Sequence, residues 1–428
     1  MIRPICISLL ISGLLAACSD GDMPAQLGVS ISIDLPDSVD PSTLSDALLT
    51  VYNVSNGSYT TLPVTNPANV PIDVLPGLYK ISFSCHATLD NGAGAEVTGA
   101  SHNCTITAAT SISLKTYCVV VTDDLIISEL FFTGTLQSSG NQYNGDQYIK
   151  LFNNTDHTIY ADGLTIFEST FLTTQKFNYD PDVMPTAMTV QALYTIPGSG
   201  TDHPVEPGRE LLIADIAIDH RAINPNSFDL SHADFEWYDE SSNPKYADID
   251  NPAVENLDKW YCYTNTIWQL HNRGFKAYGL ARIPMGAEEY LAGYYYTCDY
   301  DQVTAVGTFP MSKSSYALPN EWIVDVVTCS SQADYVWNLS IPSLDSGWTW
   351  CSTMDGDKNR YFHAVRRGLD YIDDDGRLHL RDTNNSTADF NPWVWPSEIE
   401  RQQSASDLSG TPCTTLTYDG ITPIGNDE

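Results

Sequence analysis

The chain has 428 residues, of which 54 are acidic and 20 are basic, for a formal net charge of -34. This length suits two or three domains of about 150 residues, and a hydrophobic fraction of 42% is enough for packed cores, which excludes a disordered chain. The negative charge repels nucleic acid and anionic lipid, so we expect no nucleic-acid partner. It either attracts cations and basic partners or simply keeps a surface protein soluble.

Residues 1–17 have the layout of a removable secretory signal peptide. They carry an early cation at Arg3 and an apolar stretch from Ile5 to Leu15, followed by small residues directly before Cys18. The apolar stretch is too short to cross a bilayer as a helix, which takes about 20 apolar residues.

The end of this segment, Leu15-Ala16-Ala17-Cys18, resembles the lipobox of bacterial lipoproteins. The resemblance implies that Cys18 becomes the N-terminus and is the lipid attachment site. The acidic residues directly after Cys18 are similar to the export tag of Bacteroidota surface lipoproteins, so residues 18–26 would form an acidic tether. The chain would then be anchored in the outer membrane and face the extracellular side. An ordinary signal peptide with a chance cysteine is the alternative.

Residues 27–120 are predicted to form a first β-sandwich. From Leu27 to Leu35 apolar and polar residues alternate, and further short runs with turn residues between them follow up to Leu114, which is typical of an antiparallel sandwich. The Pro-Gly turn and strand from Leu75 to Phe83 resemble prealbumin-like or carboxypeptidase-regulatory-like modules, which usually act as spacers.

Eight cysteines follow the anchor, and none forms a C-x-x-C pair. In an exported chain such wide spacing indicates disulfides or buried thiols rather than metal binding. Cys85 and Cys104 end two strand-like runs around a Gly-rich loop, so we predict a disulfide between them, worth about 3 kcal/mol in the chain-entropy model. The remaining pairing stays open.

Residues 121–396 are predicted to form a second all-β domain. Strand-like runs from Leu125 to Phe132, Tyr148 to Asn154 and Pro207 to Ala214 are separated by turn residues, and together they resemble the lamin-tail fold, an immunoglobulin-like sandwich. Lys150 departs from that family, which commonly has glutamate there. The fold class is therefore all-β, with two β-sandwich (immunoglobulin-like) domains, the second elaborated by long loop-rich insertions. Residues 397–428 are expected to be a loose C-terminal tail.

Three further stretches resemble an uncharacterised family of Bacteroidota surface lipoproteins: Asn224 to Leu230, Leu270 to Phe275 and Arg381 to Phe390. Members tend to be encoded near TonB-dependent outer-membrane transporters. The resemblance therefore implies such a transporter as a partner, without implying a mechanism.

No common catalytic signature occurs in the sequence, whether a Gly-x-Ser-x-Gly elbow, a His-Glu-x-x-His helix, a phosphate-binding loop or a dinucleotide fingerprint. We therefore predict that the protein is not an enzyme. A run of acidic residues before Gly376 resembles a calcium loop, but its spacing breaks the EF-hand pattern. We expect a hairpin turn there.

A divalent cation is the cofactor that the sequence suggests, at His232, Asp234 and Glu236. In an extended segment these three side chains would share one face, while their neighbours pack inward. A solvated strand face beside a core is the alternative.

All nine tryptophans lie from Trp237 onward. Trp348 and Trp350 are spaced to share one strand face, and we predict that they contact a partner or a ligand such as a sugar. Core packing explains most of the others equally well.

The predicted function is that of a non-catalytic surface accessory, which captures or presents a nutrient to a TonB-dependent transporter. The nutrient would be a metal, a metal complex or a glycan. The alternatives are an adhesin or structural surface protein, and a surface hydrolase with a carboxylate pair in a cleft.

Overall fold

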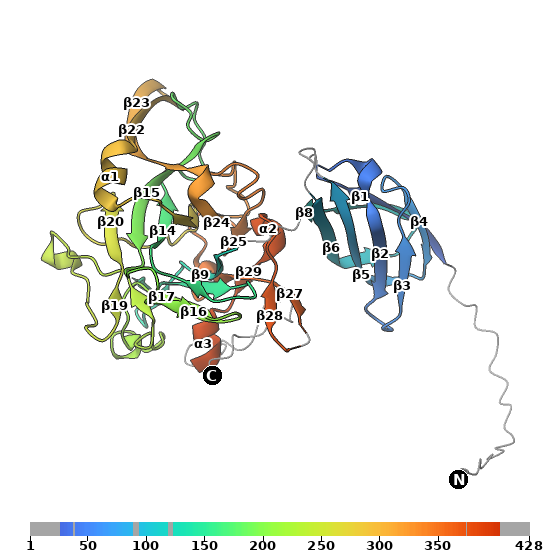
Figure 1. Ribbon diagram of the computed structural model, residues 1–428, viewed down its shortest axis with the longest axis horizontal. Coiled ribbons are helices and arrows are strands. Elements are labelled where there is room, and N and C mark those ends of the chain that lie inside the picture. The colour runs from blue at the N-terminus through green and yellow to red at the C-terminus, as the bar shows by residue number, and fades with distance from the viewer. Residues whose placement is uncertain (1–25, 37–38, 89–93, 119–122, 374, 403–428) are drawn as a thin grey trace, which may run out of the picture. The chain divides into compact units, whose positions relative to one another are not determined.

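The computed structural model describes residues 26–36, 39–88, 94–118, 123–373 and 375–402. The chain divides into two compact units, Met1–Cys118 and Val119–Glu428, a division close to the predicted one between residues 120 and 121. In both units the regular secondary structure is mainly β-strand (Figure 1). The predicted signal peptide, Cys18 and nearly all of the acidic tether lie outside the described residues.

The smaller unit is a β-sandwich with a single core. Valine, isoleucine and leucine side chains from both of its sheets, such as Ile31 and Ile81, pack in one buried cluster. The three-stranded sheet has the order β4 (Val70–Val74), β1 (Leu27–Asp34) and β7 (Thr110–Lys115). The five-stranded sheet has the order β3 (Tyr59–Pro63), β2 (Ser45–Asn53), β5 (Gly77–Thr88), β6 (Gly94–Ile106) and β8 (Tyr117–Cys118), and a short 3-10 turn η1 (Pro41–Thr43) precedes β2. The β1–β7 pair is parallel, which the expected antiparallel arrangement did not include.

The predicted disulfide between Cys85 and Cys104 is wrong. In the β5–β6 register Cys85 lies opposite Val97, whereas Cys104 lies opposite Tyr79. Six residues of strand, about 20 Å, therefore separate the two cysteines along the sheet. A disulfide needs Cα atoms within about 7 Å of each other. Cys85 and Cys104 are both free thiols.

The larger unit contains two large sheets that pack face to face. Their facing side chains, such as Ile127 and Leu151 from one sheet and Tyr194 and Leu280 from the other, form one buried cluster. The first sheet has the order β19 (Glu255–Asn256), β18 (Phe235–Glu236), β17 (Glu210–Ala214), β12 (Tyr148–Asn153), β9 (Leu125–Phe131), β26 (Ala364–Arg367) and β29 (Phe390–Val394). The second has the order β22 (Tyr295–Thr304), β23 (Gly307–Pro319), β15 (Ala187–Thr195), β14 (Leu164–Ser169), β21 (Ala277–Arg282), β24 (Ile323–Ser330) and β25 (Thr349–Trp350), with β20 (Asp258–Cys262) also paired to β15.

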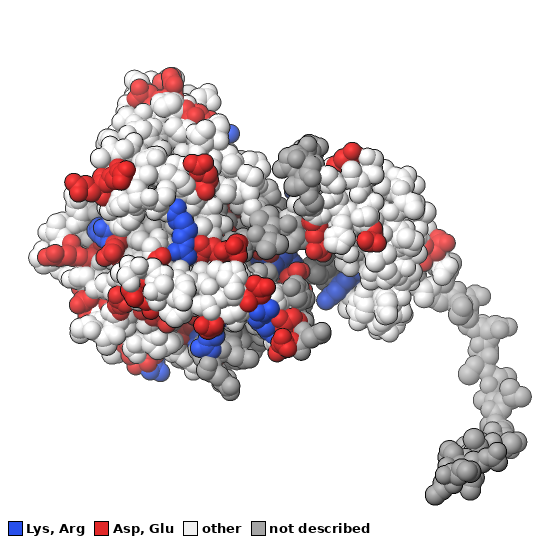
Figure 2. Space-filling view, viewed as in Figure 1, with Lys and Arg blue, Asp and Glu red and all other residues white. Residues whose placement is uncertain are grey.

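Smaller elements complete the larger unit. Three two-stranded pairs are β10 (Thr135–Leu136) with β11 (Gln142–Tyr143), β13 (Ile159–Tyr160) with β16 (Pro204–Val205), and β27 (Leu369–Ile372) with β28 (Leu378–Leu380). The helices are α1 (Ala287–Gly293), α2 (Ser386–Asp389) and α3 (Ser397–Gln402), with 3-10 turns η2 (His220–Ala222), η3 (Pro244–Tyr246), η4 (Asn320–Trp322) and η5 (Lys358–Arg360). Along the part of the chain that the structure describes, no helix is both long and apolar enough to traverse a bilayer. Acidic side chains are scattered over the surface shown in Figure 2, and basic ones are fewer.

The hairpin predicted around Gly376 is confirmed as the β27–β28 pair. Gly376 has a φ of 82°, a conformation that glycine adopts without strain. The Asp373 carboxylate accepts hydrogen bonds from the backbone N–H groups of Asp375 and Arg377 and so closes the turn.

The expected loose tail from residue 397 is wrong at its start, because Ser397–Gln402 forms helix α3 with a buried face. Glu398 is fully buried and lies 2.9 Å from the Nζ of Lys150 on β12. Glu400 pairs with Arg366 on β26 at the same distance. The lysine that departs from the lamin-tail pattern therefore holds the last described helix against the first sheet. The tail beyond Gln402 lies outside the described residues.

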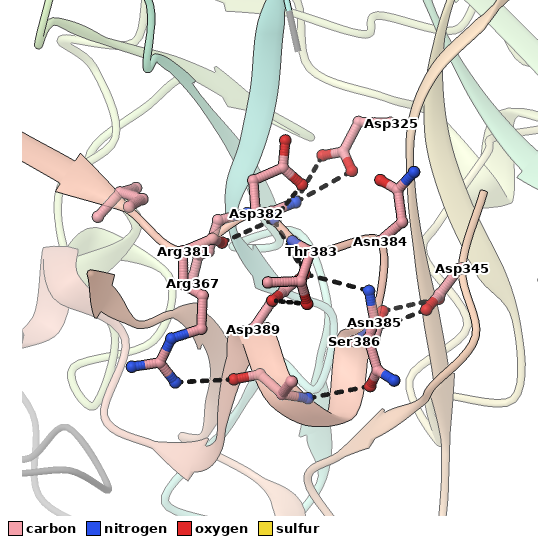
Figure 3. A network of polar contacts seen from close by, with 12 residues as sticks. Asp325, Asp345, Arg367, Arg381, Asp382, Thr383, Asn384, Asn385, Ser386 and Asp389 are labelled. Carbon is pink, nitrogen blue, oxygen red and sulfur yellow. Dashed lines mark hydrogen bonds and ion pairs between the residues drawn. The ribbon is translucent and has the colours of Figure 1, made fainter. Parts of the chain in front are cut away.

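A buried arginine joins the two large sheets (Figure 3). Arg367 on β26 is 1% exposed, and its Nη2 donates to both carboxylate oxygens of Asp325 on β24, at 3.0 and 2.8 Å. Its Nε also donates to the carbonyl of Ile127 on β9, and its Nη1 contacts Asp382 and Asp389 at 3.1 and 3.5 Å. Burial lowers the pKa of Arg367, but the carboxylates outweigh this and raise it above its ordinary value. We call this the Arg367 network.

The Arg381 to Phe390 stretch supplies much of the Arg367 network. Asn385 caps helix α2 by accepting hydrogen bonds from the N–H groups of Thr387 and Ala388. Asp389 accepts from the backbone and hydroxyl of Thr383. Asp345 accepts from the N–H and hydroxyl of Ser386 (Figure 3). This stretch therefore acts as a structural clamp and leaves few polar groups for a ligand.

Removing the buried arginine should strongly destabilise the larger unit. Arg367→Ala leaves three carboxylates in a dry site, which costs about 3–5 kcal/mol for a broken buried pair. Urea unfolding of the variant should show this loss. Arg273→Ala is the matched control, because Arg273 and Asp355 form an ion pair in which both side chains are about half exposed. The control variant should lower the free energy of unfolding by less than about 1 kcal/mol. Equal decreases in the two variants would contradict a central role for Arg367.

Candidate functional site

An aromatic pocket opens in the larger unit at the base of the β22–β23 hairpin, which stands at one end of the unit in Figure 1. The enclosed cavity is small, about 20 Å³, and the wider hollow that includes open solvent at its mouth is about 350 Å³. Its walls come from the end of β14, the segment 171–184, the start of β15, β22 and the loop 337–339. The lining residues are Ser169, Phe171, Tyr179, Pro181, Asp182, Val183, Met184, Ala187, Thr189, Tyr296, Trp337 and Leu339.

The segment after β14 is held against the hairpin by backbone and ring contacts. Asp180 and Asp299 exchange two backbone hydrogen bonds, of 2.9 and 2.8 Å. Phe177 and Tyr179 also pack against Tyr300 of β22, with ring centroids 4.8 and 5.3 Å apart. These contacts fix the pocket wall that contains Tyr179.

The aromatic rings in the pocket have fixed orientations. Tyr179 stacks on Phe171 at 4.0 Å and on Trp337 at 6.1 Å. The indole N–H of Trp337 donates to the carbonyls of Leu172 and Gln175, at 2.9 and 2.8 Å, so its polar edge is turned into the protein. The hydroxyl of Tyr296 is hydrogen-bonded to that of Thr189, and burial raises the pKa of Tyr296 to about 12. The rings therefore hold one another in fixed orientations.

Charged groups lie around the pocket residues. Asp182 is exposed and is the one ionisable carboxylate among the lining residues. The ammonium of Lys176 lies 5.1 Å from the ring centroid of Trp337. Buried Lys276 donates to the carbonyls of Ser169 and Thr170. Burial lowers the pKa of Lys276 to about 8, against the opposing effect of Glu168.

The predicted metal site at His232, Asp234 and Glu236 is not formed, because each side chain is engaged elsewhere. His232 lies 3.2 Å from Glu398 on α3. Asp234 accepts a hydrogen bond from the N–H of Leu212, and Glu236 is fully buried and accepts from two backbone N–H groups. The segment is a strand for only two residues, so the three side chains do not share the expected face. No group of three or more metal-competent side chains occurs in the residues that the structure describes.

Trp348 and Trp350 lie at the surface beside the buried Thr349, both partly exposed. Trp348 stacks on Tyr335 with centroids 4.6 Å apart. Their contact with a ligand stays a prediction. No sequence pattern singled out Phe171, Tyr179, Tyr296 and Trp337. The alternation of aromatics in Phe177-Asn178-Tyr179 before Asp180-Pro181 was the available signal, but it does not show that these rings meet Trp337.

Residues 206–397 match the family model DUF4876, described as a protein of unknown function. The match covers less than half of the chain. It includes Tyr296 and Trp337, whereas Phe171, Tyr179 and Asp182 precede it. No curated protein matches the chain.

The chain is also similar to solved structures. A DUF4876 family protein from Bacteroides thetaiotaomicron is 20% identical, and the alignment covers 90% of this chain and 99% of that one with a TM-score of 0.53. This likeness concerns the fold and agrees with an all-β architecture. A candidate adhesin from Bacteroides ovatus is 10% identical over 72% of this chain and 92% of that one, with a TM-score of 0.19, too low to support an argument. The expected resemblance to an uncharacterised Bacteroidota family is thus supported.

The Asn224 to Leu230 stretch, which also carried that resemblance, has a structural role. Asn224 donates to the hydroxyl of Thr135, and the hydroxyls of Thr135 and Ser227 both donate to one oxygen of Asp146. The other carboxyl oxygen of Asp146 is buried without a hydrogen-bond partner. Burial raises the pKa of Asp146 to about 7, despite the two hydroxyl donors.

Asp146 should make stability depend on pH near neutrality. The folded-state pKa of Asp146 lies above its unfolded-state pKa. The contribution of this carboxyl group to the free energy of unfolding is therefore fully present below about pH 4 and is lost as the pH rises through about 7. Asp146→Asn keeps the shape of the side chain but cannot carry its charge. Between pH 5 and 8.5 its free energy of unfolding should therefore rise relative to that of the parent. Each tenfold difference in proton affinity between the folded and unfolded states corresponds to about 1.4 kcal/mol.

Urea unfolding of Asp146→Asn and the parent across this pH range measures the difference. For the exposed Asp301→Asn control we expect a small difference in the free energy of unfolding. The same result for Asp146→Asn would contradict a destabilising charge at this buried position.

Proposed function

We propose that this protein is a cell-surface lipoprotein that captures a small organic ligand in the aromatic pocket and presents it to a TonB-dependent outer-membrane transporter. The pocket is the observation that carries the binding part of the proposal. Ligand sites are typically concave, mostly apolar and largely preformed, with a few polar groups that fix orientation. The ring stack around Trp337 with Asp182 at the mouth has these properties.

The surface location is supported by the lipobox-like sequence before Cys18 and the acidic residues after it. In this proposal the smaller unit is a prealbumin-like spacer and the larger one a lamin-tail-like domain that carries the pocket. With no metal site at His232, Asp234 and Glu236, a metal ion is the least supported of the expected nutrients.

Binding is better supported than hydrolysis at this pocket. Glycoside hydrolysis canonically needs two carboxyl groups on either side of the bond to be cut. Asp182 is the one carboxylate among the lining residues. The lining hydroxyls of Thr189 and Tyr296 bond to each other, so neither is activated by a neighbouring base.

An adhesin is the second candidate, because the tip of the β22–β23 hairpin exposes apolar side chains. Val303 and Val306 are 74% and 86% exposed, and Phe309 is 47% exposed. Clustered exposed apolar residues mark interaction surfaces more often than scattered ones do.

Ligand capture should depend on Tyr179. The protein is purified from its native outer membrane in mild detergent, and small molecules released on unfolding are identified by mass spectrometry. We expect a stoichiometric ligand from the parent and a loss of about tenfold in Tyr179→Ala, because the stacked ring face is removed. Tyr160→Ala, an exposed tyrosine outside the pocket, should keep the ligand. Equal retention in both variants would contradict capture by this pocket.

The same purification tests location and partner. Cys18→Ser should release the protein from membranes, since the acyl chains would have no attachment site. A TonB-dependent transporter that copurifies with the parent supports presentation. A membrane-bound protein without a transporter, together with loss of cell adhesion after truncation of the hairpin tip, would favour the adhesin instead.

A further inference from the structure

The aromatic pocket offers few unpaired polar groups to a ligand. The Ser169 hydroxyl donates to the carbonyl of Phe171 and accepts from the N–H of Ala277, at 3.3 and 2.9 Å. The Thr189 and Tyr296 hydroxyls are paired with each other, and the Trp337 indole N–H is used twice. A sugar ring carries several hydroxyls, each of which would lose its water without gaining a partner here. The pocket chemistry therefore disfavours a hydroxyl-rich ligand.

The ring faces are well placed to bind a cation. Aromatic rings carry negative charge on their faces and attract cations within about 6 Å of the centroid. The Lys176 ammonium already occupies such a position, 5.1 Å from the Trp337 centroid. Lys176 is exposed on a flexible side chain, so a ligand with a better-fitting cation can displace it. The protein's own lysine thus marks the position that a ligand cation would take.

The charges around the pocket favour the same class of ligand. Asp182 is the carboxylate that lines it, and the chain carries a net charge of -34. The ammonium of buried Lys276 is bonded to the carbonyls of Ser169 and Thr170, and the negative charge of Glu168 opposes its charge. A low-dielectric aromatic site with one carboxylate at the mouth stabilises a weakly hydrated cation.

We infer that the aromatic pocket binds an organic ammonium ion of the quaternary or methylated type. This inference rests on the proposed function, in which the pocket captures a small ligand. A weakly hydrated trimethylammonium group loses little hydration on entry and can contact the Trp337 ring where the Lys176 ammonium now lies. Two sources carry this chemistry: a free small molecule and a methylated lysine of a peptide.

Choline and its neutral isostere 3,3-dimethylbutanol are the first probes, because they differ only in the charge of the head group. Titration calorimetry on the full-length protein should show choline binding at least about tenfold more tightly, the equivalent of about 1.4 kcal/mol. A peptide that contains trimethyllysine, compared with the unmodified peptide, tests the second source. Neutral and acidic oligosaccharides complete the panel.

Two variants should move choline affinity in opposite directions. Asp182→Asn removes the lining carboxylate and should weaken binding about tenfold, whereas Lys176→Gln removes the competing cation and should strengthen it about threefold. Asp301→Asn is the matched control, an exposed aspartate on β22 outside the lining, and should leave the affinity unchanged. Both test residues are exposed, so folding is expected to be preserved, and thermal unfolding verifies this.

The outcomes separate this inference from the proposed function. Equal binding of choline and its neutral isostere, or binding of oligosaccharides alone with loss in Tyr179→Ala, overturns the ammonium inference and leaves capture by the pocket intact. Weakened choline binding in Lys176→Gln also overturns it. If no probe binds and no ligand copurifies with the parent protein, both the inference and the proposed function fail.

Discussion

The larger unit depends on one buried charge. Arg367 lies between its two sheets and satisfies its guanidinium with Asp325 on β24, the carbonyl of Ile127 on β9 and acidic residues of the Arg381 to Phe390 stretch. Removing such a charge from water is expensive, so the site is stable only when nearly every donor is paired. This requirement fixes the positions of β9, β24, β26 and α2 relative to one another.

The pocket is held together differently, because its walls are mostly apolar and are fixed by contacts between aromatic rings. Trp337 is anchored through its indole N–H, and the segment 171–184 is tied to β22 by the Asp180–Asp299 bridge. Rigid rings lose little conformational entropy when a ligand binds, because they are already ordered. The hairpin therefore has two roles in our proposal: its base forms the pocket wall, and its apolar tip is a second exposed surface.

Two of the stretches that resemble an uncharacterised Bacteroidota family have structural roles. Asn224 and Ser227 support the buried Asp146, and Asn385 and Asp389 build the cap and clamp around Arg367. Short polar motifs of this kind must satisfy buried donors and acceptors in one specific geometry. The proposed function rests instead on aromatic residues that belong to no common sequence motif.

The sequence by itself determined the all-β class, the alternating strands of the smaller unit and the hairpin at Gly376, because these follow from local periodicity and turn chemistry. It misassigned Cys85, His232 and the start of α3, since register and the partners of a charged side chain depend on segments far away in the chain. The tertiary structure alone placed Tyr179 against Trp337, residues that are more than 150 positions apart. Long-range contacts between rings leave no periodic signal, and so the candidate site could be found only after folding brought them together.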